Sequence, residues 1–275
     1  MGLLCRGRAS STDQPQSLSS EVRGFNRGLT QYDLVVLAVI RVIGGEAAGW
    51  AGLASIDLRV GNYDAARRKL QKALKTREEI GDREGQAGTW HQLAAIHVLT
   101  GDYDAASDSF QRSLMIYQEI GDREGEAEQW YGLASIDLNL GNDDAARDKF
   151  QRLITIFQQI GNRSGEVSTW LGLGMIDFRD GDYDAARNKF QKTLAMRQQM
   201  GDPAGEAKTW HQLASIDLEV GNYDAARDEY QKALTLRQEL GDRAGEAATF
   251  YQLGMLAHRS GRLAEGAGLL HSVLR

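Results

Sequence analysis

The chain has 275 residues, of which 42% are hydrophobic and 25% charged, and a formal net charge of −6. Such a length suits one or two globular domains or one elongated repeat array. The mild acidity argues against a protein that binds duplex nucleic acid, because that class needs a basic surface to displace counterions. Cys5 is the single cysteine, which excludes an internal disulfide framework and a cysteine metal site.

The first 45 residues carry no repeat. Residues 1–20 are rich in Ser and Gln, and we expect them to be disordered. Residues 21–45 are predicted to cap the array that follows, with a helix over about 25–43, although the β-branched content of this stretch opposes a helix. The longest apolar run, 34–40, is far shorter than the ~20 residues that span a bilayer. No secretion signal opens the chain, and Arg6 stands where an acylation motif needs a hydroxyl residue. We therefore expect a cytoplasmic protein with no membrane partner.

From about residue 46 the sequence repeats itself every 40 residues. Self-similarity at a fixed period is the signature of a repeat architecture. One row of the repeat is aromatic: Trp50, Trp90, Trp130, Trp170, Trp210 and Phe250. A row of glycines has the same spacing: Gly61, Gly101, Gly141, Gly181, Gly221 and Gly261. Each unit must therefore be the same structural element.

Each unit reads as two helices. The first is typified by residues 206–220, where Trp210, Leu213 and Asp217 fall on one helical face at i, i+3 and i+7. Gly221 ends this helix, since glycine adopts the left-handed conformation at low cost, and Asn222 can cap the next. The second helix turns these residues inward: Ala226, Tyr230, Ala233 and Leu234.

These residues resemble the tetratricopeptide repeat, whose pattern is Trp-x2-Leu-Gly-x2-Tyr, then Ala-x3-Phe, then Pro. The matching places in two of the units are Trp90, Leu93, Ala94, Ala106 and Phe110, and Trp170, Leu173, Gly174, Ala186 and Phe190. The resemblance covers residues 46–275 as six units, and the 40-residue period is similar to that of kinesin light chains, Pins-type adaptors and the sensor regions of bacterial signalling ATPases. It implies an all-α fold, an α-solenoid built as a right-handed superhelix of stacked antiparallel helix pairs.

The chain departs from the family pattern at the tyrosine, which is replaced by Asp57, Asp137, Asp177 and Asp217. A buried carboxylate needs a partner. The four units with this aspartate carry an arginine ten residues later: Arg67, Arg147, Arg187 and Arg227. We predict an ion pair within each unit, between Asp137 and Arg147 and likewise between Asp177 and Arg187; a functional acidic row is the alternative.

The tryptophan row has two readings, an aromatic ladder for a ligand or a set of core residues. Leucine at i+3 favours the core, and we expect Trp130 and Trp170 to be nearly fully buried. The five histidines lack the i, i+4 spacing of a helical zinc pair, and no phosphate-binding loop or nucleophile elbow occurs. We therefore expect no enzyme, no metal and no cofactor.

In this family the first helices line a concave groove, so the resemblance implies that a protein or peptide partner binds there. Residue types vary along this face while the core stays constant, as selection by a ligand would leave them. Glycines such as Gly132 and Gly172 would keep the groove roomy. The candidate binding residues are Ser55, Arg59, Gln92, Leu99, Ser135, Asn139, Met175, Arg179, Gln212, Ser215, Glu219, Gln252, Met255 and Arg259.

The sequence thus predicts a protein-interaction scaffold or adaptor that binds a peptide or protein segment in this groove. The alternative is a sensor or regulatory module whose catalytic part lies in another chain or domain.

Overall fold

The structure is a computed structural model that describes the backbone of residues 31–262 and the side chains of residues 45–262. Two predictions fall outside the described residues, namely the disorder of residues 1–20 and the second helix of the sixth repeat. The chain divides into two compact units, residues 1–81 and 82–275. The described residues of each unit form helices joined by short turns, and each unit is described by itself.

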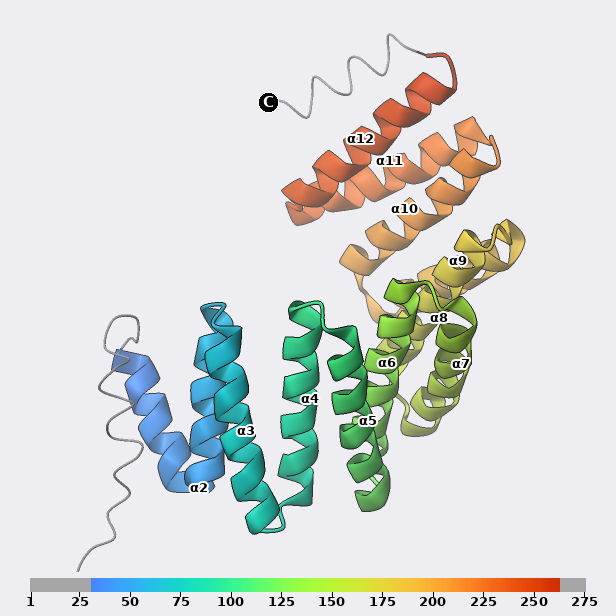
Figure 1. The fold of residues 1–275 in the computed structure, drawn as a ribbon. Coiled ribbons are helices and arrows are strands. Elements are labelled where there is room, and N and C mark those ends of the chain that lie inside the picture. Colours follow the sequence, from blue (N-terminus) through green and yellow to red (C-terminus); the bar gives the residue numbers. More distant parts are fainter. Residues whose placement is uncertain (1–30, 263–275) are drawn as a thin grey trace, which may run out of the picture. The chain divides into compact units, whose positions relative to one another are not determined.

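The first unit contains α2 (Gln31–Arg59) and α3 (Tyr63–Glu79), which lie side by side (Figure 1). α2 is two helices joined at a kink, because Gly45 has φ +70°. Its second half packs Trp50 and Leu53 against Ala73 of α3. A helix does cover much of the predicted 25–43 stretch, although it begins at Gln31; the capping role of this stretch stays a prediction.

The second unit also consists of helix pairs, and within it each helix after the first packs against the one before it (Figure 1). No strand occurs between residues 31 and 262, so the all-α solenoid of stacked antiparallel helix pairs is confirmed. The first helix of each pair is even-numbered: α4 (Arg83–Leu99), α6 (Arg123–Leu140), α8 (Arg163–Arg179), α10 (Pro203–Glu219) and α12 (Arg243–Arg259). The second helices are α5 (Tyr103–Ile120), α7 (Asp143–Ile160), α9 (Tyr183–Met200) and α11 (Tyr223–Leu240).

The breaks between helices follow the Gly–Asp and Gly–Asn pairs of the sequence. At the start of α10, Gly201 takes φ +64° and the Asp202 side chain accepts a hydrogen bond from Gly205 N. The expectation that first helices begin at the glutamate before the tryptophan is wrong by three residues, because α10 begins at Pro203. The cap lies further upstream, and proline is tolerated in a first turn, where its missing N–H has no intrahelical partner.

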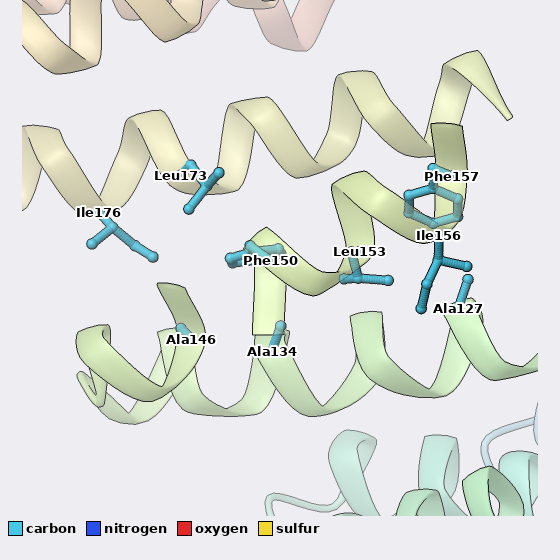
Figure 2. Close-up of a cluster of buried hydrophobic side chains, with 9 residues drawn as sticks. All are labelled: Ala127, Ala134, Ala146, Phe150, Leu153, Ile156, Phe157, Leu173 and Ile176. Atoms are coloured by element: carbon cyan, nitrogen blue, oxygen red, sulfur yellow. The ribbon is translucent and has the colours of Figure 1, made fainter. Parts of the chain in front are cut away.

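Within the second unit, the core extends from one helix pair to the next. Figure 2 shows nine buried side chains of α6, α7 and α8, among them Phe150, Leu153 and Ile176. Phe150 of α7 is 1% exposed and contacts both its own pair and α8 of the following pair. Each such side chain contributes ~1.5–3 kcal/mol on burial. The repeat therefore buries its apolar face only when it is stacked on its neighbour.

Two glycines of the first helices make room for aromatic rings of the preceding repeat. A Cβ at Gly172 would lie 2.7 Å from Phe150 Cζ, and one at Gly132 would lie 2.6 Å from Phe110 Cζ. The expectation that these glycines leave an open groove is wrong. Their missing side chains are replaced by phenylalanine rings, which is why the residue types there cannot vary freely.

The tryptophan row is only partly core. Trp50 is buried at 3% exposure, but Trp130 and Trp170 are half-buried, so the prediction that both are nearly fully buried is wrong. A basic residue of the second helix covers the ring instead: Arg152 lies 4.6 Å from the Trp130 ring centroid, and Lys192 lies 3.7 Å from that of Trp170. One ring face packs against the core and the other makes a cation–π contact near solvent.

Candidate functional site

The predicted binding residues lie on first helices, and none is fully buried. Ser55 and Arg59 are exposed on α2, in the first unit. In the second unit the exposed members are Leu99, Asn139, Met175, Arg179, Glu219, Met255 and Arg259, and the half-buried members are Gln92, Ser135, Gln212, Ser215 and Gln252. The structure thus places these residues where a partner can reach them.

Several of these residues are already engaged within the chain. The Arg179 guanidinium donates to the Leu138 carbonyl at 2.9 Å and pairs with Asp143, so it reaches back to the preceding repeat. Arg259 pairs with Glu219 at 2.8 Å. These charges connect successive repeats, and a ligand would have to compete with these contacts. They are weaker candidates than the sequence suggested.

The hydroxyl residues of the face are also engaged. Ser135 donates to the Tyr131 carbonyl at 2.8 Å, and Ser215 donates to the His211 carbonyl at 2.9 Å. The Ser215 hydroxyl also lies 3.2 Å from the hydroxyl of Tyr230. Their hydroxyl groups therefore have partners within the chain, which leaves the amide and the apolar residues of the face for a ligand.

The sequence reasoning missed the row directly after the tryptophans. Tyr131 is 38% exposed and Tyr251 is 55% exposed. Tyr131 lies edge-on to Phe150, with ring centroids 6.1 Å apart, so its ring is held in place while one side meets solvent. This row varies between repeats as much as the predicted positions do: Ala51, His91, Tyr131, Leu171, His211 and Tyr251. That variation is the signal that would have found it.

We define the exposed stripe as Leu99, Tyr131, Asn139, Met175, Tyr251 and Met255, six exposed residues of the first helices in the second unit. Five of the six side chains are large and apolar, so they extend further from the helix than the small and neutral residues expected on this face. Apolar side chains that remain in water on a folded protein are candidates for contact with a partner.

Two histidines lie beside the stripe, at its boundary with the core. His91 Nδ1 is 3.0 Å from Gln129 Oε1 of the next repeat, and the ring lies edge-on to Phe110. His211 lies edge-on to Tyr230 with centroids 5.1 Å apart. Burial, with a smaller contribution from the nearby Arg237 charge, lowers the pKa of His211 to about 4. His211 is therefore neutral at physiological pH.

The repeated aspartates pair differently from the prediction. Arg147 contacts Asp177 of the next repeat at 2.5 Å, and Arg187 contacts Asp217 of the next repeat at 2.5 Å. Asp137 pairs instead with Lys149 of its own repeat at 2.6 Å. The predicted pairing of Asp137 with Arg147, and of Asp177 with Arg187, is wrong. The arginine side chain extends toward the following first helix, and a lysine twelve residues after the aspartate takes the place within the repeat.

Asp177 shows the complete arrangement. Its side chain is 4% exposed and is held by Arg147 from α7 and Lys189 from α9. Arg147 also reaches Asp180 at 2.7 Å, so two cations and two carboxylates balance each other. The hydrogen bond to Asp177 raises the pKa of Arg147 further above its ordinary value. The cluster connects three helices of two repeats and has a structural role.

The described residues hold no group of three or more His, Cys, Asp or Glu that could bind a metal ion. Among the helices that the structure describes, none is long and apolar enough to cross a membrane.

Solved structures with the same fold include helical repeat proteins of several kinds. BtubC from P. vanneervenii is 18% identical, with a TM-score of 0.69 over 78% of this chain and 90% of that one. The apo form of RapI is 11% identical, with a TM-score of 0.69 over 83% of this chain and 96% of that one. A signal transduction ATPase with a tetratricopeptide repeat sensor, from Pyrococcus horikoshii, is 16% identical, with a TM-score of 0.70. It covers 93% of this chain, which spans only 43% of that protein.

No curated protein sequence matches this chain. The sequence model of a repeat family, in contrast, matches in three consecutive segments, residues 46–119, 126–199 and 205–265. These segments contain the whole tryptophan row and most of the helix pairs described above. The chain belongs to the tetratricopeptide repeat family.

Proposed function

We propose that this protein is an interaction module that binds a segment of a partner protein along the exposed stripe. The observation that carries the proposal is that Tyr131, Met175, Tyr251 and Met255 stay exposed on first helices whose core side chains, such as Leu133, Leu173 and Leu253, are buried. Large apolar side chains supply most of the binding energy in protein interfaces, and methionine adapts its shape to a partner.

The partner we propose is a peptide segment that carries bulky apolar side chains. The charges beside the stripe are paired within the chain, as Arg179 with Asp143 and Arg259 with Glu219, so they offer little net attraction to a charged ligand. Tyr131 is oriented by its contact with Phe150, which reduces the entropy lost when a partner packs on it. An extended segment or one face of an amphipathic helix would meet these requirements.

The test is selection of binding peptides from a random library against the full chain, followed by affinity measurements with the double variant Tyr131→Ala/Met175→Ala. We expect selected peptides to share bulky apolar residues and to bind this variant at least tenfold more weakly. Met115→Ala is the matched control, because Met115 is 56% exposed but lies on the second helix α5. Equal losses in both variants, or no enrichment at all, would refute the proposal.

A second candidate is a regulatory module of a signalling system. The likeness to the Pyrococcus horikoshii signal transduction ATPase, over 93% of this chain, is the observation that favours it. We would capture proteins from the native host with the full chain and with Tyr131→Ala/Met175→Ala. This candidate predicts that the natural chain captures an ATPase or another enzyme and that the variant does not. Adding the natural chain to that enzyme should change its activity. Capture of proteins without catalytic activity would argue for a plain adaptor.

A further inference from the structure

The cluster around Asp217 breaks the pattern of charges that the other repeats follow. Three aspartates have a lysine twelve residues later, as in Lys69, Lys149 and Lys189, and each lysine pairs with the aspartate of its own repeat. At the same place after Asp217 the residue is Glu229. A carboxyl group thus stands where the repeat ordinarily has an ammonium group.

The geometry brings the two carboxyl groups together in a place with little water. Asp217 of α10 is 4% exposed and Glu229 of α11 is 15% exposed at the side chain. Arg187 pairs with both side chains, so the two carboxyl groups lie close to each other. Two ionised carboxylates repel each other in such a place, which favours the form in which one of them holds a proton. Glu229 Oε2 is buried and has no hydrogen-bond partner.

One cation faces both carboxyl groups. Arg187 of α9 contacts Asp217 through both terminal nitrogens, at 2.5 and 3.4 Å, and lies 4.0 Å from Glu229. The Asn222 amide donates to Asp217 at 3.2 Å. Among the described residues, the other charged group that acts on Glu229 is Lys232 of its own helix. Arg187 therefore neutralises Asp217, and Glu229 remains as the group that takes the proton.

We propose that Glu229 makes the contact of α9 with α10 and α11 sensitive to pH, so that this junction between repeats weakens when Glu229 loses its proton. With the proton bound, Arg187 and Asp217 balance each other. Without it, two carboxylates face the arginine that they share, and their mutual repulsion weakens the junction.

The direction of this pH dependence follows from proton linkage. Burial, followed by the charge of Asp217, raises the pKa of Glu229 to about 7 from its ordinary value near 4.5. The folded state therefore holds this proton more tightly than the unfolded chain does. The stabilisation is fully present below about pH 4.5 and is lost as the pH rises to about 7. In the Asp177 cluster, Lys189 holds the equivalent place.

Hydrogen exchange of the backbone amides of α10 and α11 in the full chain would test the proposal. We expect the opening constant, corrected for intrinsic exchange, to rise about tenfold more between pH 5.5 and 7.5 in the natural protein than in Glu229→Gln, since one linked proton allows up to tenfold per pH unit. Glu229→Lys, which restores the residue of the other repeats, should likewise flatten the profile. A carbon NMR titration of the Glu229 carboxyl should have its midpoint near pH 7.

Lys189→Gln is the matched control, because it removes the equivalent side chain of the preceding repeat. It should raise the opening constant of α8 and α9 equally at both pH values. The proposal is overturned if Glu229→Gln keeps the full pH dependence of the natural protein, or if the carboxyl titrates near pH 4.5.

Discussion

The α7–α8 contact and the α9–α10 contact join successive repeats through equivalent helices, yet they are packed differently. At the first, the Phe150 ring lies over Gly172 of the next repeat. At the second, the Phe190 ring turns toward its own repeat, where a Cβ at Gly174 would lie 2.5 Å from Phe190 Cε1. Gln212 holds the place equivalent to Gly172. The position of one glycine thus decides which repeat receives the ring, and with it which residue the next helix can carry.

The two contacts also differ in how their charges are paired. Asp177 is held by two cations, whereas Asp217 shares one arginine with Glu229. Near-identical sequences therefore give one contact with balanced charges and one that is sensitive to protons. A repeat array can change one junction without changing its fold, because each repeat contacts only its neighbours.

Removing the aspartate, Asp177 at one contact and Asp217 at the other, should give the largest difference in stability between the two contacts. Asp177→Ala leaves Arg147 and Lys189 without their shared partner, and we expect a loss of about 3 kcal/mol in the free energy of unfolding. Asp217→Ala should cost about 1 kcal/mol, because Glu229 then neutralises Arg187. Urea denaturation of both variants at pH 8 measures the difference. Equal losses would show that Glu229 does not act on Arg187.

Exchanging the residue types of Gly172 and Gln212, which hold equivalent places in α8 and α10, should give the next largest effect on stability. Gly172→Gln forces the Phe150 ring out of its site and should destabilise by about 2 kcal/mol, within the range for overpacked cores. The reverse change, Gln212→Gly, should cost about 1 kcal/mol, the helix propensity difference alone. The urea midpoints of both variants test this, and a milder effect of Gly172→Gln than of Gln212→Gly would contradict the packing account.

His211 adds a titrating group to the α9–α10 neighbourhood, where α8 has Leu171 at the equivalent place. Burial lowers the pKa of His211 to about 4, below its ordinary 6.5. Its neutral form is favoured by folding, so this contribution is present above pH 6.5 and is lost as the pH falls to about 4. His211→Phe should therefore retain stability better between pH 6.5 and 4.5. Identical pH profiles of the urea midpoint would disprove a buried neutral histidine.

The smallest effect on stability is expected from substitutions at the position that Met175 holds in α8 and Ser215 holds in α10. Met175→Ala should change the unfolding free energy by less than about 0.5 kcal/mol, since the side chain is exposed. Ser215→Ala should cost about 1 kcal/mol, because the hydroxyl lies 3.2 Å from the Tyr230 hydroxyl. Thermal denaturation would rank them. A larger loss for Met175→Ala would mean that this residue is structural and would remove it from the exposed stripe.

The local pattern of the sequence was sufficient for the helices and their ends. Periodic Trp210, Leu213 and Asp217 share a helical face, and glycine with a following Asp or Asn ends one helix and begins the next. Such signals act within a few residues, so they are readable without the fold. They also carried the family and the location of the exposed face. The predicted pairing of aspartate with arginine within a repeat was wrong: Asp177 and Asp217 pair with an arginine of the preceding repeat, and Asp137 pairs with a lysine of its own.

The sequence by itself determined the 40-residue period, the helix pairs and the family, because these depend on short-range spacing. Only the tertiary structure decided that Arg147 reaches Asp177, that Trp130 is half-buried under Arg152, and that Phe150 fills the place of a missing side chain. In an array of near copies, a side chain meets the same residue types in its own repeat and in the next. The choice between them depends on side-chain length and on how the helices stack, which no spacing along the chain records.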